Sequence, residues 1–232
     1  MKKIFLTLVF LLIAFVSCKS KQIYVAENIA MKLNTNENLV EFKQNLLPET
    51  ADSTFVNLKN YSNDFVYDMK YATNDNFLKT KVYDCATCFL RLKTVKALIL
   101  ANQEFLKMGY KIKLYDCYRP LDVQKQMWAI VPNPNYVANP NKGSIHNKGC
   151  AIDISLVDNL GNELDMGTKF DHFGIEASHN FLKLNENTIQ NRMLLKKIMK
   201  NANFNSFESE WWHYNLAKGL QDKVSNKKWT CD

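Results

Sequence analysis

The spacing of apolar residues predicts three helices. Over residues 88–108, apolar side chains recur at the three- and four-residue intervals of a buried helical stripe, and Gly109 is a suitable stop just beyond it. The same spacing predicts a helix over residues 187–202, and a shorter helix is expected at about 121–130. Each helix should therefore turn one apolar face toward a core.

Between these helices, short apolar runs bounded by turn residues predict strands. The runs lie at about 65–69, 111–118, 150–157 and 204–210. Turn residues at 158–161 suggest that the third strand returns as a β-hairpin through Leu164 and Met166. Residues 131–143 hold three prolines and four asparagines, which predicts a long loop that is either functional or mobile.

The first residues of the chain have the pattern of an export signal. A short basic start is followed by the apolar run 4–16, which is too short to span a bilayer comfortably. We expect residues 1–17 to be a signal peptide and Cys18 to be the lipidated residue of a lipoprotein, with a plain signal peptide and an inert Cys18 as the alternative. Residues 19–55 are rich in Asn and Lys and are expected to form a tether, which leaves 56–232 as the functional domain.

Composition narrows the class of protein further. The chain has 232 residues, 47% of them apolar, so one domain with a proper core is expected. The formal net charge of +7 is spread over the chain without a dense basic run, which argues against a nucleic-acid partner. No glycine-rich nucleotide-binding motif is present.

Five cysteines remain after Cys18, and disulfides are allowed in an exported protein. The pair Cys85 and Cys88 has zinc-knuckle spacing, but no second pair of that kind exists. We therefore expect a disulfide between one of these two and Cys117 or Cys231. The odd count leaves at least one cysteine free or bonded to another molecule.

Residues 144–153 carry the strongest chemical signal, with the form S-x-H-x2-G-x-A-x-D. His146 and Asp153 supply an imidazole and a carboxylate, both of which are zinc ligands. Their spacing of seven would point them to opposite sides of a straight strand. Gly149 allows a bend between them, so we expect a corner from loop to strand that holds a metal from both arms.

A second motif near the end of the chain completes this site. His213 supplies a third ligand, and a helical turn or a bulge would bring Glu210 to the same side as a general base. Trp211 and Trp212 are expected either to wall the site or to belong to the core. Arg119 follows a predicted strand and could stabilise an oxyanion or bind a substrate carboxylate. His172 and His179, the other two histidines, are expected to be structural.

Together these motifs resemble the D-alanyl-D-alanine dipeptidases of the VanX type, peptidase family M15. The match runs in order from about 64 to 215 and is carried by 71–77 (Y-A-T-N-D-N-F), 116–120 (D-C-Y-R-P), 144–153, 166–171 (M-G-T-K-F-D) and 210–214 (E-W-W-H-Y). The resemblance implies an α+β fold, a single small domain with a central antiparallel sheet flanked by helices. This zinc fold is shared with D,D-peptidases and hedgehog domains.

The resemblance also implies a role for each site residue. One Zn2+ per chain would be held by His146, Asp153 and His213, with Glu210 as the general base and Arg119 as the transition-state stabiliser. Substrate contacts would come from Ser144 and from Asp171, which would anchor the ammonium group of a dipeptide. To these we add Tyr71, as a rim of the pocket or else a turn residue, and Trp211.

The expected function is hydrolysis of D-Ala-D-Ala or a related wall-derived dipeptide in the periplasm, by a protein anchored to the envelope through Cys18. The first alternative is a D,D-carboxypeptidase or another peptidoglycan peptidase with the same zinc site. The second is a zinc-holding binding protein without turnover, although such a protein would not need Glu210. No nucleic-acid partner is expected, contact with the membrane is expected only through the lipid anchor at Cys18, and the sequence does not fix the oligomeric state.

Overall fold

A computed structural model describes residues 50–231 of the chain. The predicted signal peptide, Cys18 and nearly all of the predicted tether lie outside the described residues. In the described part, no helix has the length and apolar character needed to cross a membrane.

Five strands form the main sheet in the order β2-β4-β5-β7-β6. They are β2 (Val66–Tyr67), β4 (Tyr110–Asp116), β5 (Ala151–Asp158), β6 (Phe204–Phe207) and β7 (Glu210–Leu216). Neighbouring strands are antiparallel except for β2, which pairs parallel to β4. The predicted central antiparallel sheet is therefore correct for four strands, and the fifth makes the sheet mixed.

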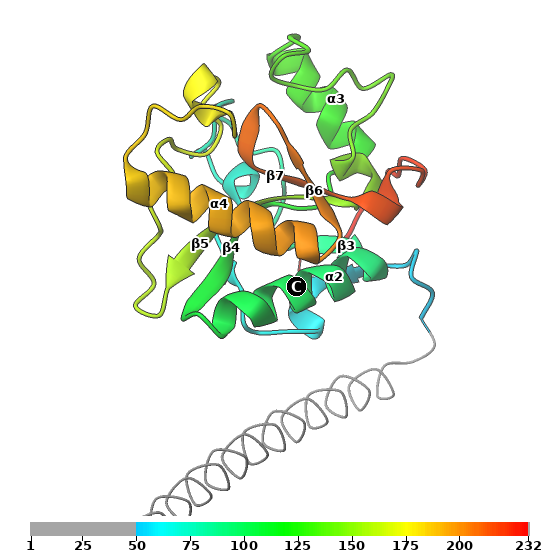
Figure 1. Cartoon of the computed structure of the whole chain (residues 1–232). Helices are drawn as coiled ribbons and strands as arrows, with labels where there is room; N and C mark the ends of the chain where they lie inside the picture. The colour runs from blue at the N-terminus through cyan, green and yellow to red at the C-terminus, as the bar shows by residue number, and fades with distance from the viewer. Residues whose placement is uncertain (1–49, 232) are drawn as a thin grey trace, which may run out of the picture. The chain divides into compact units, whose positions relative to one another are not determined.

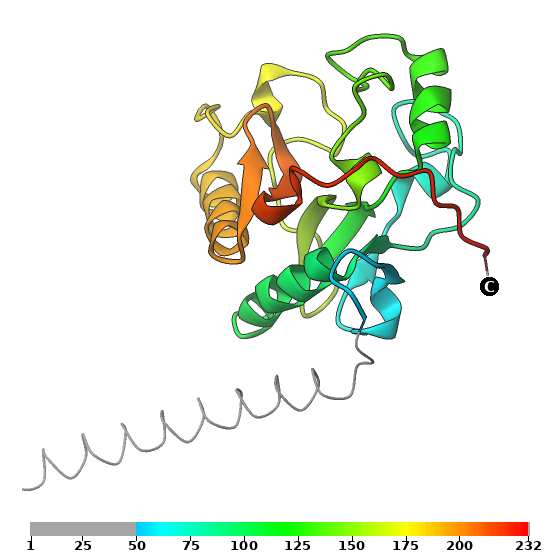
Figure 2. The same cartoon turned by 90° about the vertical axis from the view of Figure 1, so that its right-hand side faces the viewer.

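Two helices, α2 (Leu92–Leu106) and α4 (Glu186–Asn201), pack against each other and against this sheet. Both lie across the same side of the strands, as Figures 1 and 2 show. Their buried side chains join the inward residues of β5, namely Ile152, Ile154 and Leu156, in the main core. Because side chains alternate along a strand, Asp153 points to the opposite face, where polar residues can gather.

Several predicted elements are wrong in extent, and the strand expected at about 65–69 covers only Val66–Tyr67. The predicted helix at 88–108 begins only at Leu92, because Phe89–Arg91 forms strand β3, which pairs antiparallel with β1 (Phe55–Asn57). Arg91 has extended backbone angles, and its N–H donates to the carbonyl of Gly149. The predicted strand at 204–210 is in fact two strands, β6 and β7, because the chain reverses between Phe207 and Glu210.

The predicted return strand after β5 is reduced to a single bridge between Val157 and Glu163. The remaining helix, α3 (Leu121–Ile130), has the predicted bounds and lies apart from α2 and α4 (Figure 1). Short 3-10 helices lie at Leu58–Asn60, Lys70–Ala72, His146–Lys148, Ile175–Ala177 and Ala217–Gly219.

Two disulfides tie distant parts of the domain together, Cys85–Cys231 and Cys88–Cys117. Each cysteine of the 85/88 pair is thus bonded to one of the two partners predicted for it. Among the cysteines that the structure describes, Cys150 has no disulfide partner, and it is buried. The C-terminal tail runs past the start of α3 to its disulfide (Figure 2), and Trp229 packs against Phe89 on the way.

Candidate active site

His146 and Asp153 lie on the two arms of a tight corner, as predicted. His146 starts a 3-10 turn that ends at Gly149, whose φ of 69° is left-handed. A Cβ at this position would overlap the ring of Phe55, so both the backbone conformation and the space require glycine. The strand β5 begins two residues later and places Asp153 on its polar face.

The strand β7 brings His213 directly opposite Asp153, and the three predicted ligands converge. Nε2 of His146 lies 3.1 Å from Nδ1 of His213 and 3.4 Å from Oδ1 of Asp153. Nδ1 of His213 lies 2.9 Å from the same carboxylate oxygen. Zinc bonds of about 2.0–2.2 Å in tetrahedral geometry place ligand atoms about 3.3 Å apart, so this triangle fits one ion.

The outer nitrogen of each histidine is held by a hydrogen bond. Nδ1 of His146 donates to the carbonyl of Cys117 at 2.7 Å, and Nε2 of His213 donates to Oδ1 of Asn215 at 2.9 Å. A carbonyl cannot donate, so in the neutral form of each ring this bond leaves the lone pair of the other nitrogen facing the triangle. Such outer partners orient metal-binding imidazoles.

Charges in the triangle complement one another. Burial would raise the pKa of Asp153, but His146 and His213 outweigh burial and hold that pKa below its ordinary value. Burial would lower the pKa of His213, but the hydrogen bond and charge of Asp153 raise it to about 9. A metal therefore has to displace a proton from His213, and metal binding should release protons.

Glu210 lies beside the triangle rather than within it. Its Oε2 is 3.9 Å from Nδ1 of His213, although the two residues are three apart on one strand. A register irregularity between β6 and β7, at Ser206 and Phe207, accounts for this, as the bulge alternative predicted. Burial raises the pKa of Glu210, which would make the carboxylate a better proton acceptor.

Arg119 is buried and fixed by two side chains. Its Nη2 donates to Oδ2 of Asp116 at 2.6 Å, and its Nη1 donates to Oε1 of Gln124 at 2.9 Å. The guanidinium lies 5.3 Å from the ring centre of Tyr71. Its Nε finds no partner within residues 50–231, so one donor of this buried cation is unpaired.

Asp171 and Tyr71 form a second polar group. The Tyr71 hydroxyl donates to the Asp171 carboxylate at 2.9 Å, and Asp171 has a left-handed φ of 59°. Burial, followed by the negative charge of Asp153, raises the pKa of Asp171 well above its ordinary value. A ligand cation would relieve this cost of burial, so Asp171 is suited to an ammonium group.

The other predicted substrate contacts have structural partners. The Ser144 hydroxyl accepts a hydrogen bond from the backbone N–H of His146 at 3.2 Å and so caps the corner. Trp211 is buried in the main core, and its Nε1 donates to Thr168 at 2.8 Å. Trp212 is in the core as well. His172 and His179 lie outside the triangle, as predicted.

Sequence reasoning assigned no role to Asp116. This fully buried carboxylate also accepts from the Tyr83 hydroxyl at 2.6 Å and from the backbone N–H of Cys117 at 2.8 Å. It therefore links Arg119 to the backbone segment that holds His146. The sequence did hold one signal of such a role, because Asp116 ends an apolar strand. An acid that a strand carries into the core is rarely buried without a charged partner.

Comparison with known proteins identifies the family. Residues 51–230 match the peptidase M15 family model, described as D-ala-D-ala dipeptidase, and the chain belongs to this family. The predicted family and α+β fold class are thus confirmed.

Curated relatives carry the name D-alanyl-D-alanine dipeptidase. One from Escherichia coli K12 is 35% identical over 169 residues, which are 72% of this chain and 87% of the relative. Another from Enterococcus faecium is 32% identical over 171 residues, 65% of this chain and 85% of the relative. A third from Enterococcus faecalis is 33% identical over 175 residues, with the same shares covered.

Proposed function

We propose that this protein is a zinc-dependent dipeptidase that hydrolyses D-Ala-D-Ala. The observation that carries the proposal is the triangle of His146, Asp153 and His213 with the Glu210 carboxylate beside it. Two neutral imidazoles and one carboxylate form a ligand set typical of catalytic zinc. The names of the curated relatives supply the substrate.

Glu210 is the proton carrier in this proposal. A bound zinc ion would lower the pKa of a coordinated water to about 7. The Glu210 carboxylate would accept the proton from this water and deliver it to the nitrogen of the leaving D-Ala as the amide C–N bond breaks. Its position outside the ligand triangle leaves its oxygens free for this transfer.

Arg119 and Asp171 would recognise opposite charges. The guanidinium of Arg119, which Asp116 and Gln124 hold in place, would donate to the oxyanion that forms as the amide carbonyl is attacked. Asp171, with the Tyr71 hydroxyl on its carboxylate, would bind the substrate ammonium. Substrate contacts by Ser144 and Trp211 stay predictions.

A hydrolysis panel with and without a chelator tests the function. We expect fast cleavage of free D-Ala-D-Ala, little cleavage of a wall pentapeptide, and loss of activity with the chelator that zinc restores. The opposite substrate preference would indicate a D,D-carboxypeptidase. Zinc binding without any turnover would indicate a binding protein.

The base is tested by Glu210→Gln. Loss of a general base should lower kcat about 10²–10⁴-fold, while zinc content measured by atomic emission stays at one per chain. Glu208→Gln is the matched control, because Glu208 lies in the turn two residues earlier and its side chain is 55% exposed. Full activity of Glu210→Gln would show that another group takes the proton.

We also propose that the protein is exported to the periplasm and anchored through lipidated Cys18. Support comes from the two disulfides of the domain, because disulfides persist in oxidising compartments. Mass spectrometry of the mature N-terminus tests the anchor. An unmodified start beyond Cys18 would refute it.

A further inference from the structure

Four aromatic rings form a continuous row from the candidate active site to the surface. The Tyr71 ring lies 6.2 Å from that of Phe77, and the Phe77 ring lies 4.9 Å from that of Phe173, both edge to face. The Phe173 ring stacks on Tyr136 at 4.3 Å. The row begins at a residue that bonds Asp171 and ends at an exposed side chain.

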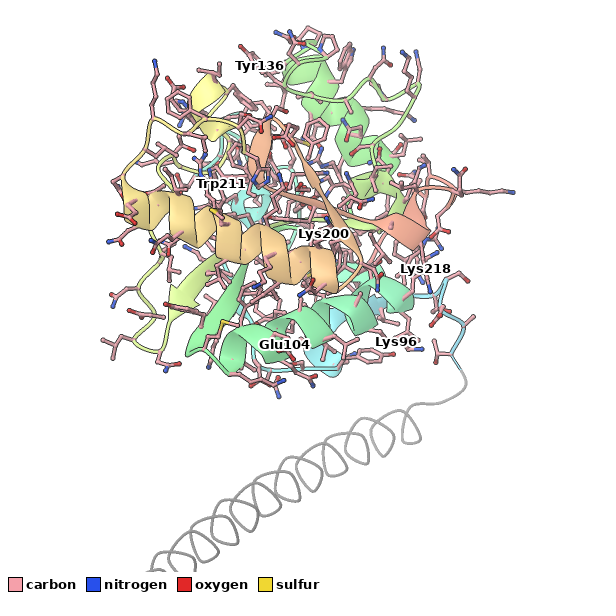
Figure 3. The ribbon with its side chains drawn as sticks, in the orientation of Figure 1. Lys96, Glu104, Tyr136, Lys200, Trp211 and Lys218 are labelled. Carbon is pink, nitrogen blue, oxygen red and sulfur yellow. A yellow bond between two sulfur atoms is a disulfide. The ribbon has the colours of Figure 1, made fainter. Side chains whose placement is uncertain are left out.

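These rings join three loops that are far apart in the sequence. Phe77 follows the 3-10 helix at Lys70–Ala72, Tyr136 lies in the loop after α3, and Phe173 precedes the 3-10 helix at Ile175–Ala177. Figure 3 shows Tyr136 at the outer tip of the domain, beside α3. Phe173 is 36% exposed and Tyr136 is 45% exposed, so the stack is not part of the core.

The loop that carries Tyr136 is also tied to the active site. Gln124 accepts from Arg119 and donates to the carbonyl of Ala138 at 2.7 Å. Next to Tyr136, Val137 is buried in a small cluster that includes Tyr71. The loop on either side of Tyr136 is therefore held by residues that contact the site.

The row stands beside the group that would bind the substrate ammonium. Asp171 precedes Phe173 by two residues, and its left-handed φ turns the chain at that point. The Tyr71 ring, whose hydroxyl bonds the Asp171 carboxylate, lies within 6.2 Å of Phe77. With the ammonium group at Asp171, a residue added to the amino end of the dipeptide would begin next to these rings.

We propose that Phe77, Phe173 and Tyr136 form a wall that closes the amino-terminal side of the substrate site and excludes peptides longer than two residues. This inference rests on the proposed dipeptidase function. In this proposal, Phe173 and Tyr136 limit the length of the substrate. Asp171 has a separate role, because its charge would select for a free amine. The stacked pair is held by aromatic contact between two loops, so removal of one ring should open the wall.

The test compares D-Ala-D-Ala with the tripeptide L-Lys-D-Ala-D-Ala. Phe173→Ala and Tyr136→Ala should each raise the ratio of tripeptide to dipeptide kcat/KM at least tenfold. Products are resolved by mass spectrometry, so that release of the terminal D-Ala is seen directly. The ratio does not depend on the fraction of folded enzyme, which cancels between the two substrates.

Two controls separate the wall from other effects. Tyr136→Phe keeps the ring and should keep the wild-type ratio. Leu182→Ala removes an apolar side chain that is 67% exposed outside the row, and it should also leave the ratio unchanged.

The outcomes distinguish this inference from the proposed function. If wild-type enzyme cleaves the dipeptide normally and the tripeptide to dipeptide ratio is unchanged in both alanine variants, the proposed wall is refuted. The charge of Asp171 would then be the basis of substrate selection. A wild-type enzyme that does not cleave D-Ala-D-Ala would overturn the proposed function and the wall together.

Discussion

Replacing Asp116 by asparagine should destabilise the domain strongly, because no orientation of the amide suits its partners. One carboxylate oxygen accepts from Tyr83 and the backbone of Cys117, and the other accepts from Arg119. In either orientation an NH2 group would face a donor. The Arg119 cation would also lose its buried counter-charge, which typically costs about 3–5 kcal/mol.

For a domain of this size, that loss corresponds to a fall in Tm of about 6–20 °C. Circular dichroism during urea and thermal unfolding measures it, with chelator present and disulfides intact. Asp75→Asn is the matched control, because Asp75 pairs with Lys70 at 2.8 Å while its side chain is 81% exposed. Exposed pairs contribute about 0–1 kcal/mol. If both substitutions cost the same, the buried network does not stabilise the domain as argued.

Three further predictions concern other parts of the domain. Gly149→Ala should reduce both stability and zinc affinity, as measured by urea unfolding and metal titration. Gly161→Ala is the control, because Gly161 also has a positive φ but open space around it, and this substitution should affect only stability. Replacing both Cys88 and Cys117 by serine should cost about 3–4 kcal/mol by loop entropy; an unchanged urea midpoint would contradict this. Burial lowers the pKa of His179 from 6.5 to about 4 in the folded protein. Between pH 4 and pH 6.5 the unfolded state therefore binds more protons at His179 than the folded state does. Unfolding free energy should fall by up to about 3 kcal/mol as the pH drops from 6.5 to 4, and His179→Gln should flatten that profile.

The parts of the fold with repeated apolar spacing could be predicted from the sequence. The bounds of the helices α3 and α4 and of the strand β5 match the prediction to within one residue. Strand β3 has only three residues and runs directly into α2, so its residues also fit the helical spacing. The turn between β6 and β7 contains no Gly or Pro, which is why the two strands were read as one.

The residues of the candidate site that lie within sequence motifs could be predicted. His146, Asp153 and His213 meet as expected, because the ligand types and the glycine bend are local features. The partners of Arg119 could not be found in this way, since Tyr83 meets Asp116 only after the chain has folded. The aromatic wall could not be predicted for the same reason, because its rings come from three separate loops that meet only in the folded chain.

The sheet order has a consequence for how the molecule is made. Strand β7 lies between β5 and β6, although it is the last strand to be synthesised. Until β7 pairs with it, β5 has an open edge, and open edges invite pairing with other chains. Because His213 lies on β7, the three candidate ligands come together only when β7 has joined the sheet.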